Sequence, residues 1–205
     1  MQQLWRGARP LVLASKSAAR RQLLEAAGIP LVIASAAVDE RAVEAPLLAR
    51  QADGAEVAAH LARAKAAAVS QLHPQDLVLG ADQTLAFDGK IFTKPETRAA
   101  AAAQLAAFAG HTHMLHSALC LMRGDACLFA HVETARLTCR PFGADFIAAY
   151  LAAAGDRVLA SVGAYQLEGL GVHLFERIEG DHATILGLPL LPLLAFLREE
   201  GSLTG

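Results

Sequence analysis

Residues 11–30 have the sequence LVLASKSAARRQLLEAAGIP, and this stretch decides the class of fold. Residues 11–14 are consecutive apolar side chains, which predict a short buried strand. Ser15 and Ser17 follow with hydroxyls that can cap a helix, and a glycine and a proline near the end of the stretch stop that helix. A second apolar run at residues 31–34 predicts another strand. The order strand, helix, strand indicates an α/β protein.

The rest of the chain alternates helical spacing of apolar residues with short apolar runs. The predicted helices cover residues 55–72, 96–108 and 146–153, with a last helix near Pro189; the predicted strands cover residues 77–79, 84–87, two segments of 114–139 around Arg123-Gly124-Asp125, and 172–178. Asp88-Gly89 suits a tight hairpin turn, and Asp39-Glu40 is placed in the loop after the second strand. Because no linker or internal repeat divides the chain, we predict a single α/β domain over residues 1–205 with a cleft, and two closely joined lobes as the alternative.

Composition excludes several classes of function. The formal net charge is −2, which gives no field of one sign to hold a nucleic acid or an anionic membrane. The apolar runs are shorter than the roughly 20 residues of a spanning helix. The odd number of cysteines, without a CxxC pair, and the absence of a charged-then-apolar leader predict reduced thiols and a cytoplasmic location.

Three kinds of side chain suited to a polyphosphate lie at the ends of predicted elements. Such a ligand needs cations for its oxygens, carboxylates for a divalent metal, and donors at a helix start. The candidates are Ser15, Ser17, Arg20 and Arg21 on the first strand-to-helix turn, the lysines Lys65 and Lys94, and the carboxylates Asp39, Glu40 and Asp82. Each also has an ordinary interpretation as a helix cap, a solvated face or a turn residue. The residues alone therefore predict an α/β protein with an anion site.

Histidines and cysteines around the predicted hairpin suggest other sites, which we do not assign. His111 and His113 would share one face of a strand, but no ligand spacing accompanies them, so surface or half-buried histidines are favoured over zinc. Cys120 and Cys127 flank the same hairpin and would lie near each other, and we interpret them as buried thiols and not as a nucleophile.

Six segments, in the same order and spacing, resemble the Maf family of nucleotide pyrophosphatases, also called septum formation inhibitor proteins. They are LVLASKSAARRQLLEAAGIP, VDE, LARAKAAAV, VLGADQTLAFDGKIFTKP, SVGAYQLEGLG and FERIEGDHATILGLPLLPLL. The resemblance runs nearly end to end. It implies a mixed sheet with flanking helices and two lobes around a cleft, similar to inosine triphosphate pyrophosphatases. It also implies a homodimer and a house-cleaning hydrolase that releases pyrophosphate with Mg²⁺, or with Mn²⁺ as the alternative metal.

The resemblance also implies roles for particular residues. The implied catalytic residues are Asp82, Lys94 and Glu40, with Asp82 as proton acceptor; the implied substrate-binding residues are Ser15, Ser17, Arg20, Lys65, Gln83 and Glu168; and the implied metal ligands are Glu40 and Asp82. Ala18 and Ala19 depart from the family pattern, in which proline and then arginine or tryptophan precede the arginine.

The base specificity is predicted from two positions. Relatives that act on dTTP and UTP tend to carry threonine and glutamine where this chain has Gln83 and Glu168, whereas those similar to 7-methyl-GTP pyrophosphatase carry glutamine and glutamate. A carboxylate can accept from the N–H groups of a guanine edge and favours the positive charge of a 7-methylated ring. We therefore favour a methylated or otherwise non-standard nucleotide similar to 7-methyl-GTP. The alternatives are dTTP or UTP as substrate, or a non-catalytic nucleotide-binding regulator of cell division.

Overall fold

The structure is a computed structural model that describes residues 4–35 and 37–205. Its strands are β1 (Leu11–Ala14), β2 (Leu31–Ile33), β3 (Val78–Phe87), β4 (Lys90–Phe92), β5 (Thr112–Arg123), β6 (Ala126–Cys139) and β7 (Phe175–Glu179). Its α-helices are α1 (Ala18–Ala26), α2 (Glu40–Ala49), α3 (Gly54–Ser70), α4 (Arg98–Phe108), α5 (Ala144–Ala154), α6 (His182–Ile185) and α7 (Leu190–Glu199). Three short 3₁₀-helices, η1 (Gly155–Ala160), η2 (Val162–Ala164) and η3 (Leu170–Leu174), lie between α5 and β7.

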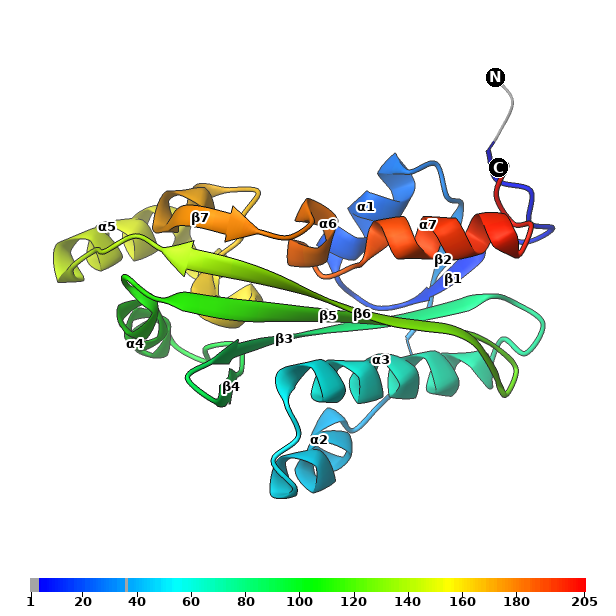
Figure 1. Cartoon of the computed structure of the whole chain (residues 1–205), viewed down its shortest axis with the longest axis horizontal. Coiled ribbons are helices and arrows are strands. Elements are labelled where there is room, and N and C mark those ends of the chain that lie inside the picture. Colours follow the sequence, from blue (N-terminus) through cyan, green and yellow to red (C-terminus); the bar gives the residue numbers. More distant parts are fainter. Residues whose placement is uncertain (1–3, 36) are drawn as a thin grey trace. The chain divides into compact units, whose positions relative to one another are not determined.

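These strands form a mixed sheet with the order β2-β1-β3-β5-β6-β7, in which β4 pairs with β3 (Figure 1). β1 is parallel to both β2 and β3, whereas β4 is antiparallel to β3 and β7 is antiparallel to β6. The predicted α/β class, with a mixed sheet and flanking helices, is confirmed. The chain divides into two compact units, the first comprising the residues up to 83, 117–133 and 182–205, and the second comprising 84–116 and 134–181.

In the first unit, helices cover both faces of the sheet. Successive side chains of a strand point to opposite faces of the sheet, so the residues of β5 pack alternately against the helices on the two faces. Leu119 and Leu121 pack with Leu193 of α7 in the larger core cluster, and α1 contributes to the same cluster. Ala118 and Cys120 belong instead to a cluster built on the alanines of α3. Figure 1 shows α1 and α7 on one side of these strands and α3 on the other.

Small residues let α3 approach β3 closely. Ala58, Ala62 and Ala66 are fully buried on the face of α3 that meets the sheet. Opposite them, Gly80 of β3 has no side chain, and a Cβ placed there would lie 2.2 Å from the carbonyl oxygen of Ala62. The separation of this helix from this strand is therefore set by a glycine, and so are the positions of the polar side chains that the two elements carry.

The second unit is built around aromatic side chains. Phe108 of α4 packs edge-on against Phe87 and Phe92, with ring centroids 5.5 and 5.0 Å apart. His113 is buried beside Phe108, and a hydrogen bond of 2.8 Å joins its Nε2 atom to the hydroxyl oxygen of Tyr165. Tyr165 thereby ties the glycine-rich stretch after η2 to β5.

Three predictions about secondary structure were wrong. Asp39 and Glu40 lie not in a loop but at the start of α2, where the Asp39 carboxylate caps the helix by accepting from the N–H of Ala42 at 3.1 Å. The two strands predicted at 77–79 and 84–87 are one strand, β3, so Asp82 lies within it and not at its end. Residues 172–174, predicted as strand, belong to η3, and β7 starts only at Phe175.

The hairpins were predicted correctly. Asp88 and Gly89 both have positive φ, 49° and 70°, and connect β3 to β4, as expected for a two-residue turn of the primed type. β5 and β6 likewise meet around Gly124, whose φ is 55°. In the ranges 4–35 and 37–205, none of the helices combines the length and the apolar character that crossing a membrane requires.

Candidate functional site

The turn between β1 and α1 brings together three of the predicted residues. Ser17 is the N-cap of α1, and its hydroxyl accepts from the backbone N–H of Arg20 at 3.4 Å. The hydroxyl oxygen of Ser15 accepts from the backbone N–H of Ser17 at 3.2 Å and from Nη1 of Arg20 at 3.1 Å. Both serines thus act as caps and turn residues, the ordinary interpretation, and they also hold Arg20 at a helix start that favours anions.

Arg20 is buried, although the sequence allowed it to lie on a solvated face. Its Nε donates to the carbonyl oxygen of Gly187 at 2.7 Å, and its Nη1 donates to that of Ala81 at 2.9 Å. Burial lowers the pKa of the guanidinium, while the negative charges of Asp82 and Glu40 raise it and offset part of that effect. The arginine therefore carries its charge in a fixed orientation beside the acidic residues of the first unit.

Gly187 makes room for this arginine. The residue has a φ of 96°, a conformation that L side chains rarely adopt. A Cβ at this position would lie 3.2 Å from both Nε and Nη2 of Arg20. A glycine here was not singled out from the sequence, because its need arises from a contact with a residue 167 positions away.

Lys65 of α3 joins two of the predicted carboxylates. Its Nζ lies 2.9 Å from Oε1 of Glu40 and 2.5 Å from Oδ1 of Asp82. The Lys65 and Asp82 side chains are 17% and 11% exposed, whereas that of Glu40 is 52% exposed. Two carboxylates from α2 and β3 thus converge on one cation from α3, and they do so at the strand that also supplies the Ala81 carbonyl to Arg20.

A third carboxylate, Glu44, was missed. It follows Glu40 by one turn of α2 and is half-buried. Its pKa is raised, first by burial and then by the negative charges of Asp82 and Glu40, and the charge of Lys65 acts in the opposite direction. The spacing of four residues from Glu40 would have indicated it, had the helix been predicted.

Gln83 follows Asp82 in β3 and contacts the chain itself. Its Nε2 donates to the hydroxyl of Ser117 at 2.9 Å and lies 3.0 and 3.2 Å from the carbonyl oxygens of Ile185 and Thr184. The two N–H bonds of the amide are therefore used within the protein.

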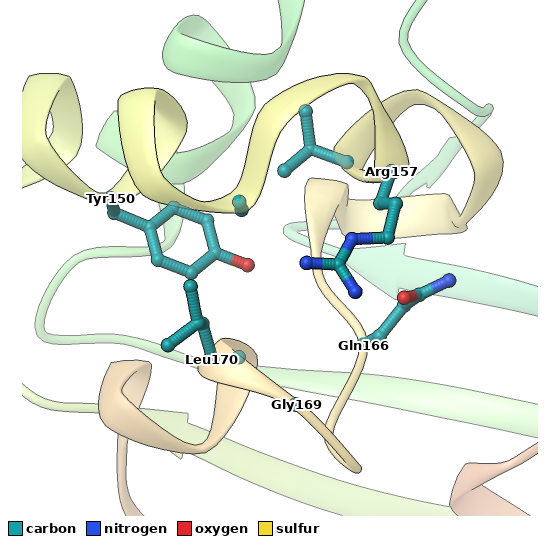
Figure 2. Close-up of a pocket in the computed structure, with 8 residues that line it drawn as sticks. Tyr150, Arg157, Gln166, Gly169 and Leu170 are labelled. Atoms are coloured by element: carbon teal, nitrogen blue, oxygen red, sulfur yellow. The ribbon is translucent and has the colours of Figure 1, made fainter.

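Lys94 and Glu168 belong to the second unit. Lys94 is exposed in the segment between β4 and α4, and Glu168 is exposed in the segment between η2 and η3. The same part of the chain borders a pocket of about 250 Å³, shown in Figure 2, where Arg157 and Gln166 lie across from Tyr150 and Leu170. None of the predicted site residues lines this pocket.

Comparison with known proteins identifies the relatives of this chain. A protein-family model described as Maf-like protein matches residues 10–200. A protein of Rhodopseudomonas palustris strain HaA2 is 56% identical, with 96% of each chain covered, and one of Nitrobacter hamburgensis is 53% identical, with 98% covered. Both are named nucleoside triphosphate pyrophosphatase. A protein of Rhizobium etli named 7-methyl-GTP pyrophosphatase is 53% identical, over 95% of this chain and 98% of its own.

Proposed function

Because this chain belongs to the Maf family, we propose that it is a nucleoside triphosphate pyrophosphatase that prefers 7-methyl-GTP and hydrolyses the bond between the α- and β-phosphates. Enzymes of this kind are hydrolases that act on acid anhydrides, and the products are a nucleoside monophosphate and pyrophosphate. The observation that carries the proposal is the convergence of Glu40 and Asp82 on Lys65, beside the buried Arg20.

The first unit supplies the charges that this reaction needs. The substrate brings several negative charges, and the leaving pyrophosphate gains more as the bond breaks. Arg20 and Lys65 offer fixed positive charge for these oxygens, and the first turn of α1 offers N–H groups. Asp82 accepts a proton from the attacking water, a role for which a carboxylate at a largely buried position is suited. By the resemblance, Lys94 contributes a further cation.

The acidic residues also fit a divalent cation. Among the residues that the structure describes, no three His, Cys, Asp or Glu side chains are grouped so as to hold a metal ion on their own. Mg²⁺ is usually held by one or two carboxylates together with substrate phosphates and water, so Glu40 and Asp82 suffice as its protein ligands. When bound, it would neutralise phosphate charge and polarise the bond to be cleaved.

The preference for a methylated guanine rests on Glu168, supported by the name of the Rhizobium etli relative. A carboxylate accepts hydrogen bonds from a guanine edge and is attracted to a cationic 7-methylated ring, whereas it repels the carbonyl oxygens of uracil or thymine. dTTP and UTP remain the alternative substrates. The cytoplasmic location and the homodimer remain predictions.

The proposal is tested by measuring pyrophosphate release with Mg²⁺ from 7-methyl-GTP, GTP, CTP, UTP and dTTP. We expect the highest kcat/KM for 7-methyl-GTP, with the monophosphate as the second product. The highest kcat/KM for dTTP or UTP would support the pyrophosphatase reaction but contradict the preference for 7-methyl-GTP. Binding of every nucleotide without pyrophosphate release from any of them would contradict the enzymatic function and indicate a nucleotide-binding regulator.

Substitution of Glu168 by Gln should change the choice of base. The amide keeps the shape of the side chain but removes the negative charge, so we expect the ratio of kcat/KM for 7-methyl-GTP to that for UTP to fall by about tenfold. The matched control is Glu176→Gln, at an exposed glutamate of β7 in the same unit. An unchanged ratio in the Glu168 variant would show that this carboxylate does not read the base.

Removal of divalent cations should abolish turnover. After treatment with a chelator and dialysis, we expect no detectable pyrophosphate release. Without the divalent cation, the carboxylates of Asp82 and Glu40 would repel the negatively charged triphosphate. Addition of Mg²⁺ should restore the full rate. The rate after addition of Mn²⁺ shows whether this metal can replace Mg²⁺. A rate that persists in the chelated protein would contradict the metal assignment.

A further inference from the structure

Two cysteines of the β5–β6 hairpin face each other outside the candidate site. Cys120 of β5 is 1% exposed and belongs to the cluster packed under α3. Cys127 of β6 is exposed, and its Sγ lies 3.6 Å from Sγ of Cys120. The sequence interpretation of both as buried thiols is therefore wrong for Cys127, whereas the expected proximity is confirmed.

At this separation the two sulfur atoms are in van der Waals contact. A disulfide requires an S–S bond of about 2.05 Å, so the two sulfur atoms need to approach by only about 1.5 Å. The turn that joins the two strands is anchored to the end of α3, since the carbonyl of Gly124 accepts from the hydroxyl of Ser70 and the carboxylate of Asp125 accepts from Gln71.

We propose that Cys120 and Cys127 form a site of reversible oxidation, in which a small-molecule disulfide such as glutathione disulfide converts the two thiols into an intramolecular disulfide. The proposal is independent of the reaction proposed above and of the residues that carry it.

The exchange proceeds in two balanced steps. The thiolate of Cys127 attacks one sulfur of glutathione disulfide, so that a mixed disulfide forms and one glutathione leaves as thiolate. Cys120 then loses its proton to solvent and attacks the Cys127 sulfur, and the second glutathione leaves. The two protein thiols are oxidised by two electrons, and one glutathione disulfide is reduced to two glutathiones.

The environments of the two thiols assign these roles. Burial, with a smaller contribution from the hydrogen bond to Cys127, raises the pKa of Cys120 to about 12. Cys120 is therefore the slower, resolving thiol, and the exposed Cys127 reacts first, because the thiolate is the attacking species. Cys139 is buried in the second unit, and burial raises its pKa to about 12 as well, so it provides an internal control.

The sequence allows a direct test. The folded protein is equilibrated with glutathione disulfide, the remaining thiols are alkylated in denaturant, and trypsin is added. Trypsin cuts after Arg98, Arg123 and Arg136, so that Cys120 lies in the peptide 99–123 and Cys127 in the peptide 124–136. We expect mass spectrometry to find these two peptides linked, with a mass two hydrogen atoms below their sum, and Cys139 alkylated.

Matched variants complete the test. In Cys120→Ser, Cys127 should stop at the glutathione mixed disulfide, and in Cys127→Ser, Cys120 should remain a thiol; Cys139→Ser should still give the linked peptides. The linked peptides should disappear on addition of dithiothreitol. Native protein in which Cys127 retains glutathione, or in which all three thiols are alkylated after equilibration, would overturn the proposal.

Discussion

Substitution of Asp82 by Asn is expected to lower kcat by about 10³-fold, the scale of a lost general base, while nucleotide binding is retained. The asparagine has the same shape and keeps its place in β3, but it cannot accept a proton from water. It also leaves Lys65 with Glu40 as its acidic partner. Pyrophosphate release and the Kd for a non-hydrolysable nucleotide analogue measure the two quantities separately.

The control for this substitution is Asp53→Asn. Asp53 caps α3 in the same unit, and its carboxylate accepts from the N–H of Glu56 at 2.8 Å, a bond that asparagine can also make. We expect wild-type kcat and stability from it. If the Asp82 variant retained the wild-type kcat, Asp82 would have no part in the mechanism; if it lost nucleotide binding to the same extent as kcat, its role would be binding and not proton transfer.

Gly80→Ala is expected to destabilise the protein by about 3 kcal/mol and to abolish activity. The added methyl group would lie 2.2 Å from the Ala62 carbonyl and 2.5 Å from the backbone nitrogen of Ala66, and a helix backbone cannot move aside as a side chain can. Overpacking of a core costs about 1–3 kcal/mol, and a contact with backbone belongs at the upper end of this range. Denaturant unfolding followed by circular dichroism measures the change.

Activity should fall in this variant even under conditions where it remains folded. α3 carries Lys65 and β3 carries Asp82, so any separation of the two elements weakens their contact. Gly143→Ala serves as the control, since a Cβ there meets no other atom within 4 Å, and we expect it to cost less than about 1 kcal/mol. Equal stability of the Gly80 and Gly143 variants would contradict the packing argument.

Elements with strong local signals were predicted well from the sequence. The first strand, the serine-capped helix after it and the Asp88-Gly89 turn depend on neighbouring residues alone, and all three are present. α2 was missed because Pro46 lies inside it and only one of its residues, Leu47, is fully buried, so that neither periodicity nor composition marks it. Residues 172–174 satisfy a strand pattern, but the N–H of Gly171 bonds to the carbonyl of Gln166 and closes a turn before them.

The contacts of the candidate site were beyond sequence reasoning. Glu40, Lys65 and Asp82 were each singled out, yet their convergence on one nitrogen joins a helix start, a helix interior and a strand. Such a contact is determined by tertiary packing, in this case by the small residues between α3 and β3. The burial of Arg20 was not predictable for the same reason, since its partners, Ala81 and Gly187, are 61 and 167 positions away.

The hydrogen bonds of Arg20 have a consequence for the entropy of binding. A free arginine or lysine side chain has about 2 kcal/mol of rotamer entropy, much of which is lost when it is immobilised on a ligand. Arg20 is already immobilised, because Ser15, Ala81 and Gly187 fix its guanidinium during folding. An anion that binds at the start of α1 therefore contacts a donor that has no further rotamer entropy to lose. The free energy of binding of the anion is not reduced by a cost of immobilising this side chain.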